Sequence, residues 1–326
     1  MTEFLQLAIQ GLALGSIYAL IALGFVIIYK ATEVINFSHG ALMLLGAYVT
    51  FTFTTAQIPN PFGDAVDFPS WLGWWSDLDI KWRFTISVAL AVMAVAGVGI
   101  LIERTILRKM VGQPVFAVIL ITLGLELVIR TGVQITWNPQ QKSFPSPFQA
   151  GSSVSVGGVA ISTANLFAIG VTLLLVPAFF VFFRYSRFGV AMRATAFDQE
   201  AAMSLGIKAS TVFAIAWAIA GGLAAVAGAF FVPARLAGFL TITPVAFSAL
   251  RAFPAAILGG LDSPGGAVLG GIIIGEAEVL TSFYISDDLF DLGFANFHLV
   301  LPYVIMIAIL LVRPYGLFGT REVRRV

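Results

Sequence analysis

The chain has 326 residues, of which 59% are hydrophobic and 11% are charged, and its formal net charge is +1. Soluble domains carry roughly 25% charged residues, and a soluble fold of this size could not hide so much apolar surface, so the bilayer is the expected solvent. The small net charge gives no general attraction for nucleic acid, and the absence of cysteine excludes disulfides, thiolate metal sites and cysteine catalysis.

Apolar runs of bilayer length recur along the chain. A helix crosses the hydrocarbon core in roughly 20 apolar residues. Seven runs approach that length: 7–29, 84–102, 115–136, 164–183, 211–232, 265–283 and 297–312. Two further segments, 38–55 and 246–260, are shorter or interrupted and are counted as spans too. The first run lacks a basic leader and is too long for a cleaved signal peptide, so we expect it to be the first of about nine spans.

Glycines in the first run indicate close helix packing. Gly11 and Gly15 are four residues apart and therefore share one helix face. Small residues let helix backbones approach each other within a membrane. We expect this face to lie against another span.

The basic residues predict the orientation of the spans. With the C-terminus inside, the inner segments hold most of them: Lys30, Arg104, Arg108, Lys109, Arg184, Arg187, Arg193, Lys208, Arg313, Arg321, Arg324 and Arg325. The outer segments hold only Lys81, Arg83, Lys142 and Arg235. This asymmetry satisfies the positive-inside rule. It predicts an N-terminus outside and a cytoplasmic C-terminus.

One outer segment, 56–83, is rich in tryptophan: Trp71, Trp74, Trp75 and Trp82. Indole rings prefer the headgroup level of a bilayer. The simpler interpretation is an amphipathic segment lying on the outer surface. The alternative is a docking surface for an extracytoplasmic partner.

The sequence lacks the motifs of a self-contained enzyme. It has no Gly-x4-Gly-Lys-Ser/Thr loop for nucleotide phosphates, no His/Glu spacing typical of zinc and no Gly-x-Ser-x-Gly elbow. We therefore predict no catalytic residue, no metal site and no ATPase site in this chain. Energy for uphill transport would have to come from an ion gradient or from another subunit.

The longest inner loop, about 184–210, predicts a short amphipathic helix at the inner surface. Asp198 can cap its start, and Gly206 stands where a helix would end in a left-handed residue. The apolar positions follow a helical spacing and form one stripe: Phe197, Ala201 and Leu205, with Ala202 beside them. By shape alone, a helix resting on lipid headgroups is an equally good interpretation.

Within this loop, Glu200-Ala-Ala-x3-Gly206 resembles the Glu-Ala-Ala-x3-Gly signature of the permease subunits of ATP-binding-cassette importers. The Leu-Pro that follows in the family consensus is absent. In that family the loop forms the helix that docks on the ATPase subunit. The resemblance implies a coupling role, without solute contact, for Arg193, Phe197, Asp198, Glu200, Ala201, Ala202, Leu205 and Gly206.

A wider resemblance covers nearly the whole chain. Five stretches are similar to branched-chain amino-acid importer permeases. They are Gly15-Ser-Ile-Tyr-Ala-Leu-Ile-Ala-Leu-Gly24, Ile35-Asn-Phe-Ser-His-Gly40, the Gly46-Ala-Tyr that follows, Ile257-Leu-Gly-Gly-Leu-Asp-Ser-Pro-Gly-Gly-Ala-Val-Leu-Gly270 and Arg313-Pro-x-Gly-Leu-x-Gly319. Asp262 departs from the pattern, which has glycine there, and puts the local turn in doubt.

This resemblance implies a single permease domain over 1–326 within a larger assembly. The expected fold is an all-α polytopic bundle of about 8–10 transmembrane helices, with interrupted helices and a cytoplasmic coupling helix. The expected partners are a second homologous permease forming a heterodimer, two ATPases that bind ATP–Mg, and a periplasmic binding protein. The expected location of this chain is the bacterial inner membrane. This chain itself would hold no cofactor. The expected solutes are branched-chain amino acids, or related small amino acids, amides or urea.

Two segments, 35–46 and 244–260, are candidates for lining the solute path, because non-helical backbone within a membrane must face protein or a water-filled cavity. The candidate residues are Asn36, Ser38, His39, Gly40, Arg251, Gly259, Gly260 and Glu276. Ordinary inner-surface turns are the alternative, and for His39 a simple bond to a backbone carbonyl is the simpler expectation.

A rival function is a self-contained secondary transporter or channel for a small polar solute. It requires ionisable groups in mid-membrane, and Glu126, Arg251 and Glu276 are the few candidates for that role. Glu126 and Arg130, four residues apart, are expected to form a structural ion pair. Glu276 and Glu278 point roughly 200° apart on a helix, so at most one of them can face a path.

Overall fold

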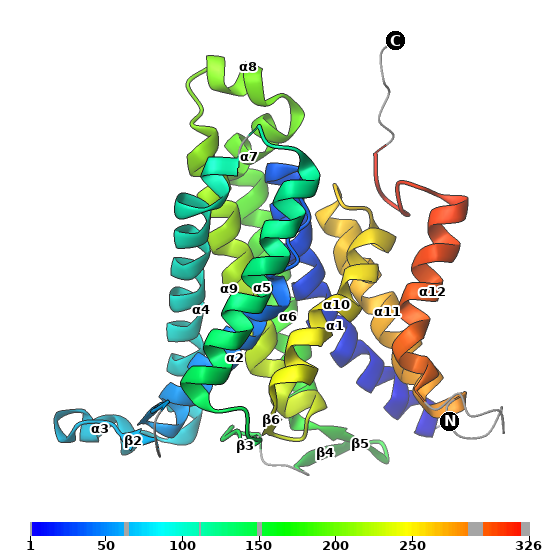
Figure 1. The fold of residues 1–326 in the computed structure, drawn as a ribbon. Coiled ribbons are helices and arrows are strands. Elements are labelled where there is room, and N and C mark those ends of the chain that lie inside the picture. The colour runs from blue at the N-terminus through cyan, green and yellow to red at the C-terminus, as the bar shows by residue number, and fades with distance from the viewer. Residues whose placement is uncertain (1, 62–64, 111, 149–151, 286–295, 321–326) are drawn as a thin grey trace. The chain divides into compact units, whose positions relative to one another are not determined.

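The computed structural model describes residues 2–61, 65–110, 112–148, 152–285 and 296–320, and it is mainly helical (Figure 1). The α-helices are α1 (Thr2–Thr32), α2 (His39–Thr55), α3 (Gly73–Ser76), α4 (Ile80–Thr105), α5 (Val115–Trp137), α6 (Thr163–Tyr185), α7 (Arg187–Phe197), α8 (Gln199–Ser204), α9 (Ala209–Arg235), α10 (Ile242–Gly259), α11 (Pro264–Tyr284) and α12 (Phe297–Val312). Two 3₁₀ turns are η1 (Ser70–Leu72) and η2 (Leu107–Met110).

The strands are short and form three antiparallel pairs among the described residues. They are β1 (Gln57–Ile58), β2 (Val66–Asp67), β3 (Lys142–Ser143), β4 (Ser153–Val156), β5 (Val159–Ser162) and β6 (Phe239–Leu240). β1 pairs with β2, β3 with β6, and β4 with β5. The pairs belong to the loops between spans and leave the all-α character of the chain unchanged.

Each predicted span lies in a helix. Within the described ranges, seven helices are long and apolar enough to cross a membrane: α1, α4, α5, α6, α9, α10 and α11. α2 and α12 are shorter, with 17 and 16 residues. The predicted all-α, polytopic membrane fold is therefore confirmed.

The structure differs from the prediction at 244–260. We expected an interruption there, but α10 runs continuously through Pro244 and Pro254. Pro244 lies in the first turn, where backbone N–H groups have no helical partner to lose, and a proline within a span can be tolerated when neighbouring groups satisfy the backbone. By contrast, the first part of the predicted interruption at 35–46 is present. Residues 33–38 are non-helical, because Glu33 has a left-handed φ of 56° that ends α1, whereas residues 39–46 belong to α2.

Packing divides the chain into two units, each built from separated stretches. Unit 1 comprises 1–33, 153–212 and 250–326, and unit 2 comprises 34–152 and 213–249.

The core of unit 1 is the pairing of α1 with α11, and α6 also packs on α1. A Cβ added at Gly15 would lie 2.7 Å from the Cα of Ile272. Across the same contact, a Cβ at Gly275 would collide with the Gly15 backbone, and one at Gly271 with that of Ala19. The face predicted from Gly11 and Gly15 is thus a packing face, and it meets a second pair of glycines with the same spacing.

In unit 2, α2 packs against α4 and α5. The stretch of α9 that belongs to this unit also approaches its neighbours through glycines. A Cβ at Gly99 would lie 2.6 Å from the Trp217 carbonyl oxygen, and one at Gly228 would collide with the Met43 carbonyl. An aromatic cluster around Phe84, with ring contacts to Phe144, Phe148 and Phe230, fills one end of the unit.

Candidate functional site

The inner loop forms two short helices, α7 and α8, at the end of unit 1 remote from the start of α1 (Figure 1). The Ser186 hydroxyl caps α7 by accepting a bond from the Gly189 N–H at 2.9 Å. The Asp198 carboxylate caps α8 by accepting one from the Ala201 N–H at 2.9 Å. Gly206 follows α8 with φ +89°. The predicted cap and the predicted left-handed terminator are both confirmed.

The predicted continuous apolar stripe is wrong at one point. Asp198 is extended, with φ −156° and ψ 106°, so it breaks the helical phase between Phe197 on α7 and Ala201 on α8. Phe197 is 95% exposed and Leu205 is 83% exposed, whereas Ala202 is buried. The loop therefore presents two large apolar side chains outward, which fits the predicted docking helix and the alternative of a helix resting on lipid headgroups equally well.

Arg193 ties α7 to the end of α6. Its guanidinium donates to the Phe183 carbonyl and, at 3.2 Å, to the Arg184 carbonyl. It also lies over the Phe183 ring, 5.4 Å from the centroid. Lys30 at the end of α1 lies 5.7 Å from the same centroid. One aromatic ring thus joins the ends of α1 and α6 to the loop.

The turn between α10 and α11 joins this arrangement. Lys30 Nζ donates to the Asp262 carbonyl at 2.8 Å. The Asp262 carboxylate accepts from the Thr320 N–H at 2.9 Å and from the Thr320 hydroxyl. We call Lys30, Phe183, Arg193, Asp262 and Thr320 the junction. It connects the ends of α1, α6 and α10 with α7 and the chain after α12.

Asp262, a departure from the family pattern, therefore has a structural role. The segment after α12 also pairs with the end of α10, since the Leu317 N–H donates to the Leu258 carbonyl at 2.8 Å. Gly260, with φ +102°, permits this approach, because a Cβ there would lie 2.6 Å from the Gly319 nitrogen. Gly259 is equally close-packed, against the backbone of Gly266. These glycines hold the turn together, and their predicted contact with solute stays a prediction.

The path residues of the first segment lie together in unit 2 and are fully buried. Asn36 Oδ1 accepts from the Ser38 N–H at 3.0 Å and from the Ser38 hydroxyl at 2.6 Å. His39 begins α2 and is 0% exposed. Gly40 packs on the Ala246 carbonyl, where a Cβ would collide. The segment is therefore an ordered turn that starts α2.

The path residues of the second segment lie in unit 1, and one of them, Arg251, contacts a carboxylate other than Glu276. Arg251 Nη1 lies 3.7 Å from Glu278 Oε1, and the Tyr18 hydroxyl donates to Glu278 Oε2 at 2.7 Å. Glu278 is 2% exposed. Glu276, which the sequence analysis favoured, is half-buried against Gly11 instead. Tyr18 was not predicted and Glu278 was named only as the alternative to Glu276, because nothing in the local sequence reveals partners on distant spans.

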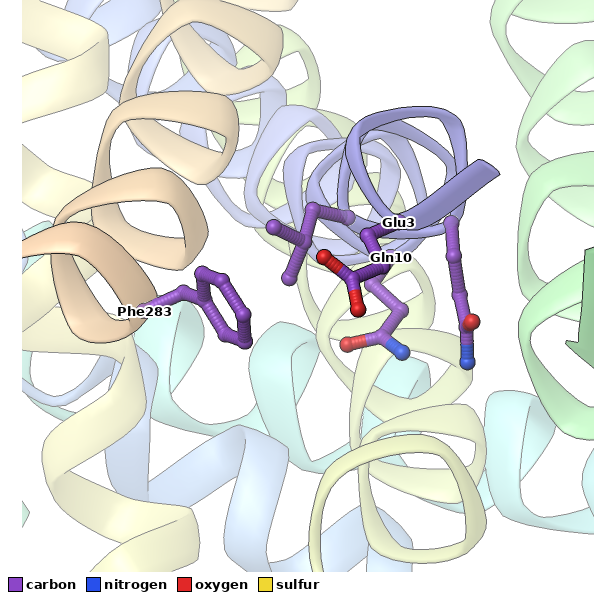
Figure 2. A pocket seen from close by; sticks show the side chains of 5 residues that line it. Glu3, Gln10 and Phe283 are labelled. Carbon is purple, nitrogen blue, oxygen red and sulfur yellow. The ribbon is translucent and has the colours of Figure 1, made fainter. Parts of the chain in front are cut away.

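A pocket of about 310 Å³ lies at the first turns of α1 beside the end of α11 (Figure 2). Its lining is Glu3, Gln6, Leu7, Gln10 and Phe283. None of these was predicted to line the path. A signal was present: three polar side chains at i, i+3 and i+7 in an otherwise apolar span share one helix face, and such groups usually face a protein interior or water.

The expected structural ion pair is present in α5. Arg130 Nε lies 3.4 Å from Glu126 Oε1, and both side chains are about one-quarter exposed. Arg130 also lies 5.7 Å from the centroid of the Phe247 ring. Among the described residues, no group of three or more histidine or acidic side chains could hold a metal ion.

The architecture is that of a multi-pass helical membrane protein with an ordered loop between α6 and α9. The family model described as branched-chain amino acid transport system / permease component matches residues 7–310. The chain belongs to this family.

Curated relatives cover almost the whole chain. The high-affinity branched-chain amino acid transport system permease protein LivH of Salmonella typhimurium is 31% identical over 99% of this chain and 98% of its own length. BraD of Pseudomonas aeruginosa, a permease protein of the same description, matches with the same identity and coverage. The probable LivH of Methanocaldococcus jannaschii is 28% identical over 94% of this chain and 89% of its own. The comparison with solved structures found no significant match.

Proposed function

We propose that this chain is the transmembrane permease subunit of an ATP-binding-cassette importer that carries branched-chain amino acids, or related small amino acids, amides or urea, inward across the bacterial inner membrane. The family match over residues 7–310 carries this proposal. It also favours the importer over a self-contained transporter, whose expected mid-membrane group Glu126 is already paired with Arg130.

In this proposal the loop at about 184–210, which we call the coupling loop, moves with the partner ATPases. ATP–Mg binds on the partner ATPases, which close, and a subunit docked on Phe197 and Leu205 then moves α7 and α8. The junction passes this motion to α1, α6 and α10, because Arg193 and Lys30 share the Phe183 ring. The spans switch between inward-facing and outward-facing states, and hydrolysis resets them. This chain contributes no ATPase chemistry.

The proposed assembly contains a second homologous permease, two ATPases and a periplasmic binding protein, with the C-terminus of this chain in the cytoplasm. The positive-inside count supports this orientation. The junction supports it as well, because Lys30, Arg193 and the segment after α12 meet at one end of unit 1.

The buried turn at Asn36 is the best-supported part of the proposed solute path. Among the residues described, the Asn36 amide nitrogen is buried and has no hydrogen-bond partner. A buried donor without a partner costs about 1–3 kcal/mol. A passing solute or water would satisfy it. Ser38, His39 and Gly40 hold this turn, whereas Arg251, Gly259, Gly260 and Glu276 remain proposed path residues of unit 1.

The deciding experiment is a mild-detergent pull-down of the tagged chain from its native membrane, combined with uptake and ATPase assays of the recovered complex. We expect ATPase subunits to copurify. Glu200→Lys with Gly206→Pro should abolish their recovery, and Gly206→Pro alone should insert normally yet uncouple uptake from ATP hydrolysis. The matched control is Gly112→Pro, since Gly112 also has positive φ and open space around it.

Recovery of this chain alone, with native expression verified, would overturn the importer assignment. Normal coupling in Gly206→Pro would overturn the role of the loop while leaving the importer standing. The solute class is then tested with radiolabelled leucine, competed by unlabelled valine and by urea.

A further inference from the structure

In the tryptophan-rich segment of unit 2, one indole is buried and hydrogen-bonded, and the other three are exposed. The Trp75 indole N–H donates to the Phe53 carbonyl at 2.7 Å, and Trp75 is only 7% exposed. Its ring contacts the Phe53 ring, which also meets Phe68 edge-on. The end of α2 is thereby held between two aromatic rings of the segment.

Backbone and side-chain bonds fix both ends of the segment. Strands β1 and β2 pair Gln57 with Asp67. On the other side, Asp79 caps α4 by accepting from the Lys81 N–H at 2.9 Å, and Arg83 donates to the Ser76 carbonyl at 3.0 Å. Residues 68–78 therefore connect two bonded positions, and α3 extends sideways from the ends of α2 and α4 (Figure 1).

Three indoles point outward from this frame. Trp71 is 74% exposed, Trp74 is 58% exposed and Trp82 is 67% exposed. Exposing so much aromatic surface to water is unfavourable, and each ring buries up to 150–250 Å² when covered. All three rings lie outside the packed part of unit 2, so a cover that removes this cost must come from outside the frame.

The position of Trp82 identifies the cover. It lies in the first turns of α4, a helix long and apolar enough to cross a membrane. On the same face of α4 as Trp82 lie the exposed apolar side chains Ile86 and Met93, at i+4 and i+11. This face meets lipid in a spanning helix, so Trp82 stands where the lipid-facing surface of α4 reaches the end of the span. Indole rings are enriched at that level, with the apolar body in lipid and the N–H toward headgroups.

We propose that Trp71, Trp74 and Trp82 form an aromatic anchor that lies in the headgroup region of the bilayer and fixes the depth of the α2–α4 end of unit 2. The acidic residues Asp77 and Asp79, which are exposed, follow the anchor residue Trp74 closely in sequence, and the proposal places them on its water side. The rival occupant, an extracytoplasmic protein, would have to cover a surface that is continuous with the lipid-facing side of α4.

The chain lacks cysteine, so a single spin label can be placed without other changes. Gly73→Cys carries the label within the anchor, because a side chain there has open space. Ser155→Cys in the exposed hairpin of unit 1 is the control. The full chain is reconstituted into phosphatidylethanolamine–phosphatidylglycerol vesicles, with and without its copurified partner subunits, and the accessibility of each label to oxygen and to a water-soluble nickel complex is measured.

We expect a several-fold higher oxygen-to-nickel ratio at residue 73 than at residue 155, with or without partners. Trp71→Ser with Trp74→Ser should lower the ratio at residue 73 toward the control value while leaving the thermal unfolding temperature unchanged. A label at residue 73 that is as nickel-accessible as the control would overturn the proposal. So would shielding that appears only when partner subunits are present, which would assign the indoles to protein docking.

Discussion

At the scale of single residues, the buried Glu278 carboxylate of unit 1 has two partners on other helices. Arg251 supplies the opposite charge at 3.7 Å and Tyr18 a hydrogen bond at 2.7 Å. Removing one member of a buried pair typically costs about 3–5 kcal/mol, because it strands the other charge, whereas removing both costs far less.

We therefore expect Arg251→Met to lower the unfolding temperature strongly and Arg251→Met with Glu278→Gln to recover most of the loss. The measurement is thermal unfolding in detergent, followed by size-exclusion chromatography. Arg130→Met is the matched control, since the pair it breaks is partly exposed and should contribute about 1 kcal/mol or less. Equal losses for Arg251→Met, the double variant and Arg130→Met would contradict this account.

A second residue-scale prediction concerns Asp262. Asp262→Gly, the residue typical of the family, removes the acceptor for Thr320 but keeps the carbonyl that Lys30 contacts. Each lost bond should cost about 0.5–1.5 kcal/mol. We expect faster amide hydrogen exchange over 313–320 with little change elsewhere, and Asp262→Asn should restore protection. Unchanged exchange would show that the carboxylate does not hold this segment.

At the scale of elements, α1 and α11 depend on reciprocal glycines. A Cβ at Gly15 would lie 2.7 Å from Ile272, so Gly15→Leu must force the helices apart. Overpacking typically costs about 1–3 kcal/mol. We expect a sharply reduced yield of monodisperse protein. Gly124→Leu in α5, where a side chain meets open space, should behave like the parent chain, and similar yields for the two variants would refute the packing role.

The elements themselves could largely be predicted from the sequence, because apolar length and capping are local properties. All nine span segments became helices, and Asp198 and Gly206 took the predicted end positions. The errors occurred where local rules compete. Asp198 began a second helix and so broke the stripe through Phe197, and Pro254 did not interrupt α10.

The candidate site was less predictable, because its contacts join residues far apart in sequence. A helical wheel could not decide between Glu276 and Glu278, because Tyr18, the hydrogen-bond partner of Glu278, lies 260 positions away in the sequence. The junction was invisible for the same reason: Lys30 and Asp262 are 232 positions apart. Helix geometry relates neighbours a few positions apart, and it says nothing about which distant spans meet.

At the scale of the whole molecule, the proposed orientation can be tested because the chain has no cysteine. We expect Ser204→Cys, exposed on α8, to react with a membrane-impermeant maleimide only after the cytoplasmic side is opened. Ser155→Cys in the exposed β4–β5 hairpin should react in intact cells lacking an outer membrane. The reverse labelling pattern would invert the proposed topology, and labelling of both positions in intact cells would indicate mixed insertion.

The pairing of α1 with α11 also has a consequence for how the chain is made. The ribosome synthesises α1 first, yet its contact residue Glu278 follows Tyr18 by 260 positions. At roughly 5–20 residues per second, this delay lasts on the order of 10 to 50 seconds. During translation the glycine face of α1 is therefore in the membrane before α11, the helix that packs on it, has been made. A chain that stops before α11 lacks the helix that packs on this face in unit 1.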